Sequence, residues 1–146
     1  MTSPVEYVIR VYIIKGFDLH SRDSTGSSDP YLLVELGSQR IDTRDKHLND
    51  VTTAPFHHMF ELRTELPGTS LLSISCMDWD SFGRASDDLI GATVIDLEDR
   101  LFSPKWAAEL AERPPLETRP LFCAHSKHPQ GYLELWVEIL TGEEAS

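Results

Sequence analysis

The chain has 146 residues and a mass of 16.5 kDa, and 40% of its residues are hydrophobic, which is the composition of one globular domain and excludes a disordered chain. Its formal net charge is −11 and its isoelectric point is near 4.8. Because no Lys- or Arg-rich stretch interrupts this acidity, we expect neither nucleic-acid binding nor unaided attraction to an anionic membrane.

Alternating apolar residues predict about eight short strands, separated by segments rich in Gly, Pro, Asp and Ser. In the first strand, Ile9, Val11 and Ile13 share the face that we expect to be buried. The last strand has the cleanest alternation, with Glu134 and Glu138 on its outward face. The predicted strands are residues 7–14, 31–36, a short strand near Ile41, 56–62, 71–77, 89–97, 119–123 and 132–140.

One helix is predicted between the late strands. Ser103 is a good N-cap and Pro104 suits the first helical turn, while Pro114 ends the helix after Arg113. The acidic tail, residues 141–146, is expected to fray. Short strands without strand–helix–strand alternation favour an all-β fold, an eight-stranded antiparallel β-sandwich, over a doubly wound fold.

The cysteines and the N-terminus indicate a cytoplasmic protein. Cys76 and Cys123 are too few for a disulfide framework, and Cys76 lies in an apolar alternation typical of a core thiol. Residues 1–7 lack the features of a signal peptide, and no apolar run approaches the roughly 20 residues of a transmembrane helix. We expect a single domain over residues 1–146, with its core at about 5–140.

Two acidic loops follow predicted strands, and loops at one end of a sandwich cluster in space. Like charges about 4 Å apart repel by about 4 kcal/mol at an effective dielectric near 20, so such a cluster is costly unless it is solvated, protonated or filled by a cation. Oxygen ligands from flexible loops suit Ca²⁺ better than Zn²⁺ or Mg²⁺. The acids of the two loops are Asp23, Asp29, Asp78, Asp80, Asp87 and Asp88.

Two other interpretations of these aspartates compete with a shared calcium site between the two loops. The first is that they are solvated turn residues, since Asp is typical of turns. An EF-hand is excluded, because a loop starting at Asp78 has Leu89 where a bidentate Glu is required, and a loop starting at Asp23 has Ser28 at its glycine position.

Residues 16–31 (GFDLHSRDSTGSSDPY) and 78–91 (DWDSFGRASDDLIG) resemble the calcium-binding loops of C2 domains. The resemblance covers nearly the whole chain, from about residue 7 to 140, and implies the circularly permuted (type II) C2 topology. Residues 91–102 (GATVIDLEDRLF), 59–62 (MFEL) and 131–139 (GYLELWVEI) are similar more specifically to the ferlins. Ferlins are tail-anchored proteins with several C2 domains that act in membrane fusion and repair, and this chain resembles one of their membrane-proximal C2 domains.

The resemblance assigns the calcium ligands to five aspartates. Because the stretch from Asp80 to Asp88 is longer than in most relatives, Asp87 is the alternative to Asp88 as the final ligand. A second departure from the family is Ala54-Pro55, where relatives usually have Asn-Pro. The implied ligands are Asp23, Asp29, Asp78, Asp80 and Asp88.

The tip of the second loop carries the predicted membrane contacts. Phe82 is expected to insert into a bilayer and Arg84 to contact lipid phosphate, the alternative being a Phe that folds back on the loop. Trp79, between two ligands, is expected to brace the loop.

Other motifs carry little signal. Cys123, His125 and His128 have only a faintly zinc-like spacing, and neighbours on a strand such as His57 and His58 point to opposite faces. The sequence has no G-x-S-x-G, phosphate-binding glycine loop or H-E-x-x-H, so we expect a module that is not an enzyme.

Together these features predict a calcium-dependent phospholipid-binding module of a ferlin-like protein of vesicle fusion or membrane trafficking. Its expected cofactor is Ca²⁺, and its expected partners are anionic membranes, other C2 domains of the same chain or fusion proteins. We expect it at the cytosolic face of a membrane, in a tail-anchored multi-domain parent. The alternative is a calcium-independent scaffold or protein-interaction domain.

Overall fold

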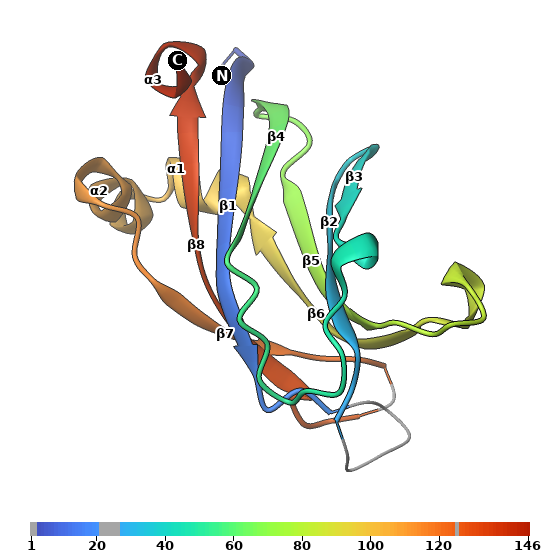
Figure 1. Ribbon diagram of the computed structural model, residues 1–146. Helices are drawn as coiled ribbons and strands as arrows, with labels where there is room; N and C mark the ends of the chain where they lie inside the picture. The colour runs from blue at the N-terminus through green and yellow to red at the C-terminus, as the bar shows by residue number, and fades with distance from the viewer. Residues whose placement is uncertain (1–2, 21–26, 125) are drawn as a thin grey trace.

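Two four-stranded antiparallel sheets form a sandwich in the computed structural model, which describes residues 3–20, 27–124 and 126–146. Within these residues the strand order is β4-β1-β8-β7 in one sheet and β3-β2-β5-β6 in the other (Figure 1). The predicted eight-stranded β-sandwich is therefore confirmed. The strands are β1 (Val5–Phe17), β2 (Pro30–Leu36), β3 (Gln39–Asp42), β4 (His58–Leu66), β5 (Leu71–Asp78), β6 (Asp88–Asp96), β7 (Glu117–Leu121) and β8 (Gly131–Thr141).

The order of the strands is the predicted type II order. β1 pairs with β4 on one side and with the last strand, β8, on the other. The chain passes from β1 directly into the first acidic loop, and β8 is the additional strand at the end. The start of β1 and the end of β8 lie at one end of the sandwich, opposite the end at which β5 ends and β6 begins (Figure 1).

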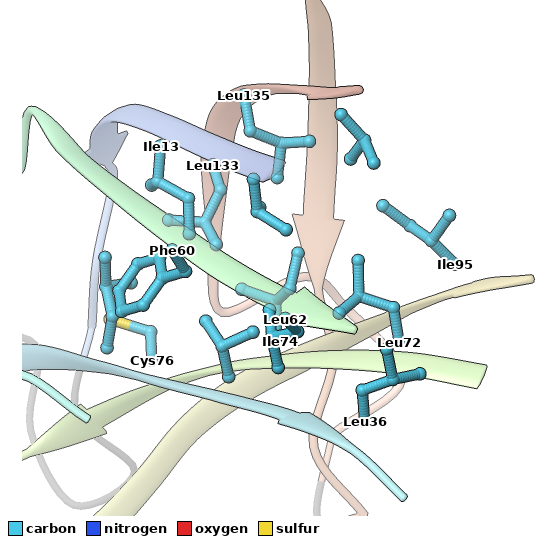
Figure 2. Close-up of a cluster of buried hydrophobic side chains, with 14 of the residues drawn as sticks. Ile13, Leu36, Phe60, Leu62, Leu72, Ile74, Cys76, Ile95, Leu133 and Leu135 are labelled. Atoms are coloured by element: carbon cyan, nitrogen blue, oxygen red, sulfur yellow. The ribbon is translucent and has the colours of Figure 1, made fainter. Parts of the chain in front are cut away.

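The core forms where the inward faces of the two sheets meet. Cys76 is fully buried, and burial raises the pKa of its thiol, as expected for a core cysteine. Burying a Leu, Ile or Phe side chain stabilises the fold by about 1.5–3 kcal/mol, so these residues dominate its stability. Figure 2 shows the core side chains Ile13, Phe60, Leu62, Leu133 and Leu135 from one sheet with Leu36, Leu72, Ile74, Cys76 and Ile95 from the other.

Two helices, rather than the single predicted one, connect β6 to β7. Helix α1 (Leu97–Phe102) follows its N-cap Asp96, whose side chain accepts the Glu98 N–H at 3.0 Å. This cap ends β6 at Asp96, so the predicted strand through Leu97 is one residue too long. Ser103 has extended backbone, and helix α2 (Pro104–Glu112) then starts at the predicted proline.

A buried ion pair ties α1 to β7. Arg100 is 4% exposed, and its two terminal nitrogens donate to the Glu117 carboxylate at 2.8 and 2.6 Å. Its guanidinium also lies 3.8 Å from the centre of the Trp106 ring on α2. Arg119 also binds the Glu117 carboxylate, at 3.1 Å, so two arginines share one acid.

The C-terminal tail, which we expect to fray, forms a helical turn in the structure. Helix α3 (Gly142–Ala145) has a complete capping box, in which Thr141 and Glu144 bond reciprocally through side chain and backbone. Arg10 of β1 donates to the Ala145 carbonyl at 2.9 Å. No helix in the described part of the chain is long and apolar enough to cross a membrane.

Candidate functional site

The ends of three neighbouring strands bring predicted ligands together. Asp29 directly precedes β2, Asp78 is the last residue of β5 and Asp88 is the first residue of β6. In the sheet register Asp78 lies opposite Asp88 on one side and opposite Pro30 on the other. The order β2-β5-β6 therefore places these three aspartates side by side at the loop end of the sandwich.

Backbone amides hold the carboxylates in this arrangement. The Asp29 N–H donates to Asp78 Oδ1 at 2.8 Å, and the Trp79 N–H donates to the Asp29 carbonyl at 2.9 Å. Asp80 follows, with its Oδ1 accepting the Phe82 N–H at 2.8 Å. These bonds orient one oxygen of Asp78 and one of Asp80.

Asp78 is the aspartate of this group whose pKa the other three aspartates raise. Burial raises its pKa, and the negative charges of Asp29, Asp88 and Asp80 raise it further, while the hydrogen bond from the Asp29 N–H opposes them. The negative charges of three predicted ligands thus act on a fourth, Asp78. A cation bound beside Asp78 would relieve this repulsion.

The donor set fits Ca²⁺ chemically, because it contains only carboxylate oxygens. The fifth predicted ligand, Asp23, lies outside the described residues. Among the residues that are described, no three His, Cys, Asp or Glu side chains already form a group arranged to hold a metal ion. We call the four aspartates Asp29, Asp78, Asp80 and Asp88 the cup, and by themselves they do not form a coordination shell.

Asp87, the alternative final ligand, is engaged elsewhere. Its side chain is fully buried and forms an ion pair with Arg44 at 2.7 Å, and the Tyr31 hydroxyl also donates to it. Burial by itself would raise the pKa of Asp87, but the hydrogen bonds from Arg44, Tyr31 and the Asp80 N–H outweigh it and hold the pKa at about 2. Asp88, beside Asp78, is the better candidate for the cup.

The loop tip exposes both predicted membrane contacts to solvent, one of them as an ion pair. Phe82 is 89% exposed, so it does not fold back on the loop. Arg84 is an ion-pair partner of Asp42 at 2.7 Å, with 61% of its side chain exposed. The guanidinium therefore reaches solvent while one of its nitrogens is held by the protein.

Trp79 braces the loop, as predicted. Its ring stacks on His47 with the ring centres 4.0 Å apart and 11° between the planes. His47 belongs to the connection between β3 and β4, so the stack joins that connection to the second acidic loop.

The same connection supplies residues that the sequence did not mark. Asp50 donates its N–H to Asp29 Oδ1 at 2.7 Å, and its carboxylate accepts the Ser27 hydroxyl. Arg44 belongs to a short 3-10 turn, Arg44–Lys46, directly after β3. Of the weakly zinc-like set, His125 is outside the described residues.

A family model for the C2 domain matches residues 7–111. The chain belongs to the C2 domain family. Human myoferlin is 39% identical to it over 100 residues, which are 68% of this chain and 5% of myoferlin. Mouse Fer-1-like protein 4 is 38% identical over 100 residues, with the same shares. The predicted resemblance of this C2 domain to the ferlins is thus confirmed, and the chain spans about 5% of the length of these relatives.

Solved structures give the same fold for this C2 domain. A calcium-bound structure of two C2 domains of extended synaptotagmin 2 is 26% identical to it, with a TM-score of 0.70. The match covers 95% of this chain and 48% of that one.

Proposed function

We propose that this C2 domain binds anionic phospholipid membranes in a calcium-dependent manner, through the loop end that carries Asp29, Asp78, Asp80 and Asp88. The observation that carries the proposal is the environment of Asp78, whose pKa is raised by burial and by three neighbouring carboxylates. A divalent cation relieves this repulsion more completely than solvent does, since Ca²⁺ takes six to eight oxygen ligands. The calcium-bound extended synaptotagmin structure supports the same choice of ion.

The carboxylates of the cup would hold the ion, with Asp23 as the further ligand that the family resemblance implies. Bound Ca²⁺ would supply positive charge at the loop end and coordination positions for lipid phosphate oxygens. Two ions would add four positive charges and bring the formal charge from −11 to −7, with the change concentrated at the surface that meets lipid. Attraction to an anionic membrane then becomes conditional on calcium.

Phe82 would add apolar binding energy at the same end. The residue is 89% exposed, and burying a Phe side chain in the bilayer contributes about 1.5–3 kcal/mol. The exposed part of Arg84 would lie close enough to contact a lipid phosphate beside it. The sandwich itself need not change shape, so the mechanism is an electrostatic switch at a rigid end.

The cellular setting follows from the relatives and is part of the proposal. The named relatives are ferlins and extended synaptotagmins, and this chain matches only a small part of each ferlin. We place the domain at the cytosolic face of a membrane, as a non-catalytic module of a larger, tail-anchored protein of membrane fusion or trafficking. Neighbouring C2 domains and fusion proteins are its expected protein partners.

Vesicle sedimentation tests the proposal. The chain is mixed with phosphatidylcholine vesicles, with or without phosphatidylserine, in EDTA or in millimolar Ca²⁺. We expect sedimentation only with phosphatidylserine and Ca²⁺ together, and loss of it in the double variant Asp78→Asn, Asp80→Asn. Glu109→Gln on the exposed side of α2 removes an equal charge per site away from the loops and serves as the control.

Two outcomes would redirect the proposal. Calcium uptake in calorimetry without sedimentation would leave an ion-binding domain that does not bind membranes. Absence of both would favour the calcium-independent scaffold or protein-interaction domain.

A further inference from the structure

The backbone of Asp80 is held on both sides by one ion pair. The Asp80 N–H donates to Asp87 Oδ1 at 2.8 Å, and the Asp80 carbonyl accepts from Arg44 Nη2 at 3.0 Å. Arg44 and Asp87 in turn bind each other through Nε–Oδ2 at 2.7 Å and Nη2–Oδ1 at 3.1 Å. The two side chains therefore form a closed ring with the peptide groups of a proposed calcium ligand.

The pair is fixed to the rigid part of the domain. The Tyr31 hydroxyl of β2 donates to Asp87, and the Arg44 N–H donates to Asp42 Oδ1 at 3.0 Å at the end of β3. Only 18% of the Arg44 side chain and none of the Asp87 side chain is exposed. A bidentate Arg–carboxylate pair at this depth has a defined geometry and is weakly screened by salt.

The conformation of the loop tip around Phe82 depends on the Asp80 carbonyl as well. The Asp80 carbonyl also accepts the Gly83 N–H at 3.2 Å, which closes the turn that exposes Phe82. Gly83 has a φ of 112°, a conformation that side chains rarely adopt. Holding Asp80 therefore sets the start of this turn as well as the direction of the Asp80 carboxylate.

We propose that Arg44 and Asp87 are positioning residues that orient Asp80 and thereby set the calcium affinity of the cup. The inference deepens the proposed function and rests on it for the role of Asp80 as a ligand. Ordering a loop before it binds removes an entropic cost from the binding step. Asp87 then positions Asp80 and does not bind the ion itself, because Arg44 compensates its charge.

The charge of Arg44 allows a decisive test. Considered as a charge alone, Arg44 repels a cation, so its removal would tighten calcium binding. Considered as a positioning residue, it orders Asp80, so its removal weakens binding. Changes around a metal ligand of this indirect kind cost about 10- to 100-fold in affinity.

The experiment measures the calcium affinity of the whole chain by calorimetry for Arg44→Met, Arg44→Lys and the control Lys46→Met. The control removes the same charge from an exposed side chain in the same 3-10 turn as Arg44. We expect Arg44→Met to weaken the affinity about tenfold, Arg44→Lys to weaken it by less, and Lys46→Met to leave it unchanged or tighter. An affinity of Arg44→Met equal to or above that of the wild type would overturn the inference.

Hydrogen exchange in EDTA tests the positioning without calcium. The Asp80 amide should exchange faster in Arg44→Met than in the wild type, whereas the amide of Leu72 in the buried strand β5 should not change. Equal exchange at Asp80 would overturn the positioning role. A wild-type chain that takes up no calcium would refute the proposed function and the affinity role together, while the exchange at Asp80 would still decide whether the pair orders the loop.

Discussion

Replacing Asp78 by Asn should stabilise the domain in chelator and abolish its response to calcium. The pKa of Asp78 is raised because burial and the charges of Asp29, Asp88 and Asp80 disfavour its ionised form. An acid whose pKa rises on folding weakens the folded state at neutral pH, so removing its charge removes a destabilising contribution. Asn keeps an oxygen that can accept the Asp29 N–H, so the 2.8 Å hydrogen bond is preserved.

The magnitude follows from the repulsion and its screening. Like charges about 4 Å apart repel by about 4 kcal/mol at an effective dielectric near 20, and water around the partly exposed Asp78 reduces this to a net gain of about 1 kcal/mol. In a chain of 146 residues, about 1 kcal/mol corresponds to a rise in Tm of roughly 2–4 °C. The wild-type chain, by contrast, should gain about 2.7 kcal/mol when free Ca²⁺ is about a hundredfold above Kd.

Thermal unfolding followed by circular dichroism in EDTA and in millimolar Ca²⁺ measures both effects. Asp78→Asn should be the more stable protein in EDTA and the less stable one in Ca²⁺, so the order of the two Tm values reverses. Glu109→Gln, the same change of charge on the exposed side of α2, should follow the wild type in both buffers. A Tm of Asp78→Asn below the wild type in EDTA, or an intact calcium shift, would refute the reasoning.

Three further predictions test the loop tip, the buried ion pair and the tail. Phe82→Ser should weaken binding of the calcium-loaded domain to vesicles at least tenfold, from a loss of about 1.5–3 kcal/mol, and leave calcium affinity in calorimetry within about twofold; a large change in calcium affinity would contradict a role in lipid contact. Glu117→Gln should lower the free energy of unfolding in urea by about 3 kcal/mol, because it leaves the buried Arg100 guanidinium without a counter-charge; a loss below about 1 kcal/mol would be inconsistent with the buried pair. The N–H and hydroxyl of Thr141 hold the pKa of Glu144 below its usual value, so this capping contribution is present above the usual glutamate pKa and is lost as pH falls through the lower folded value. NMR titration should show the low pKa and its partial rise in Thr141→Ala, and an ordinary pKa in the wild type would argue against the cap.

Strand alternation was sufficient to predict the sandwich, because each strand has one face in the core. In β8, Leu133, Leu135 and Val137 are all buried, at 0–2% exposure, as their spacing indicates. The helical region was harder because two start signals compete there. Ser103-Pro104 is the stronger of the two helix-start patterns, but Asp96 caps a helix earlier in the chain. This earlier start is hidden in the sequence because the apolar alternation of β6 continues to Leu97.

The proximity of Asp29, Asp78 and Asp88 could be predicted because they lie at the ends of strands whose pairing the family resemblance already implies. Arg44 could not, since its partner Asp87 is 43 residues away in sequence. Its position depends on how the β3–β4 connection crosses the second acidic loop, and no local pattern encodes that crossing. Long-range contacts between two irregular segments are the part of a site that strand spacing does not determine.

Gly91 shows the reverse case, a motif residue whose reason appears only in the structure. It follows the cup residue Asp88 by three positions in the D-L-I-G motif. A Cβ at this position would lie 2.8 Å from the Leu121 Cβ and 2.9 Å from the Leu121 carbonyl carbon. β6 therefore passes β7 too closely for a side chain, and the Ala92–Phe122 bridge joins the two sheets beside it. The glycine serves the packing that fixes the start of β6, and through it the position of Asp88.

The net charge of −11 does not by itself decide whether the domain meets an anionic membrane, because the acids of the loop end have two different environments. Asp87 and Asp42 are bound by Arg44 and Arg84, so their charges are compensated within the protein. Asp78, in contrast, is surrounded by carboxylates whose charges raise its pKa. The proposed function predicts that an arginine introduced next to Asp78 would take the place of the cation and reduce calcium binding without reducing the number of acids.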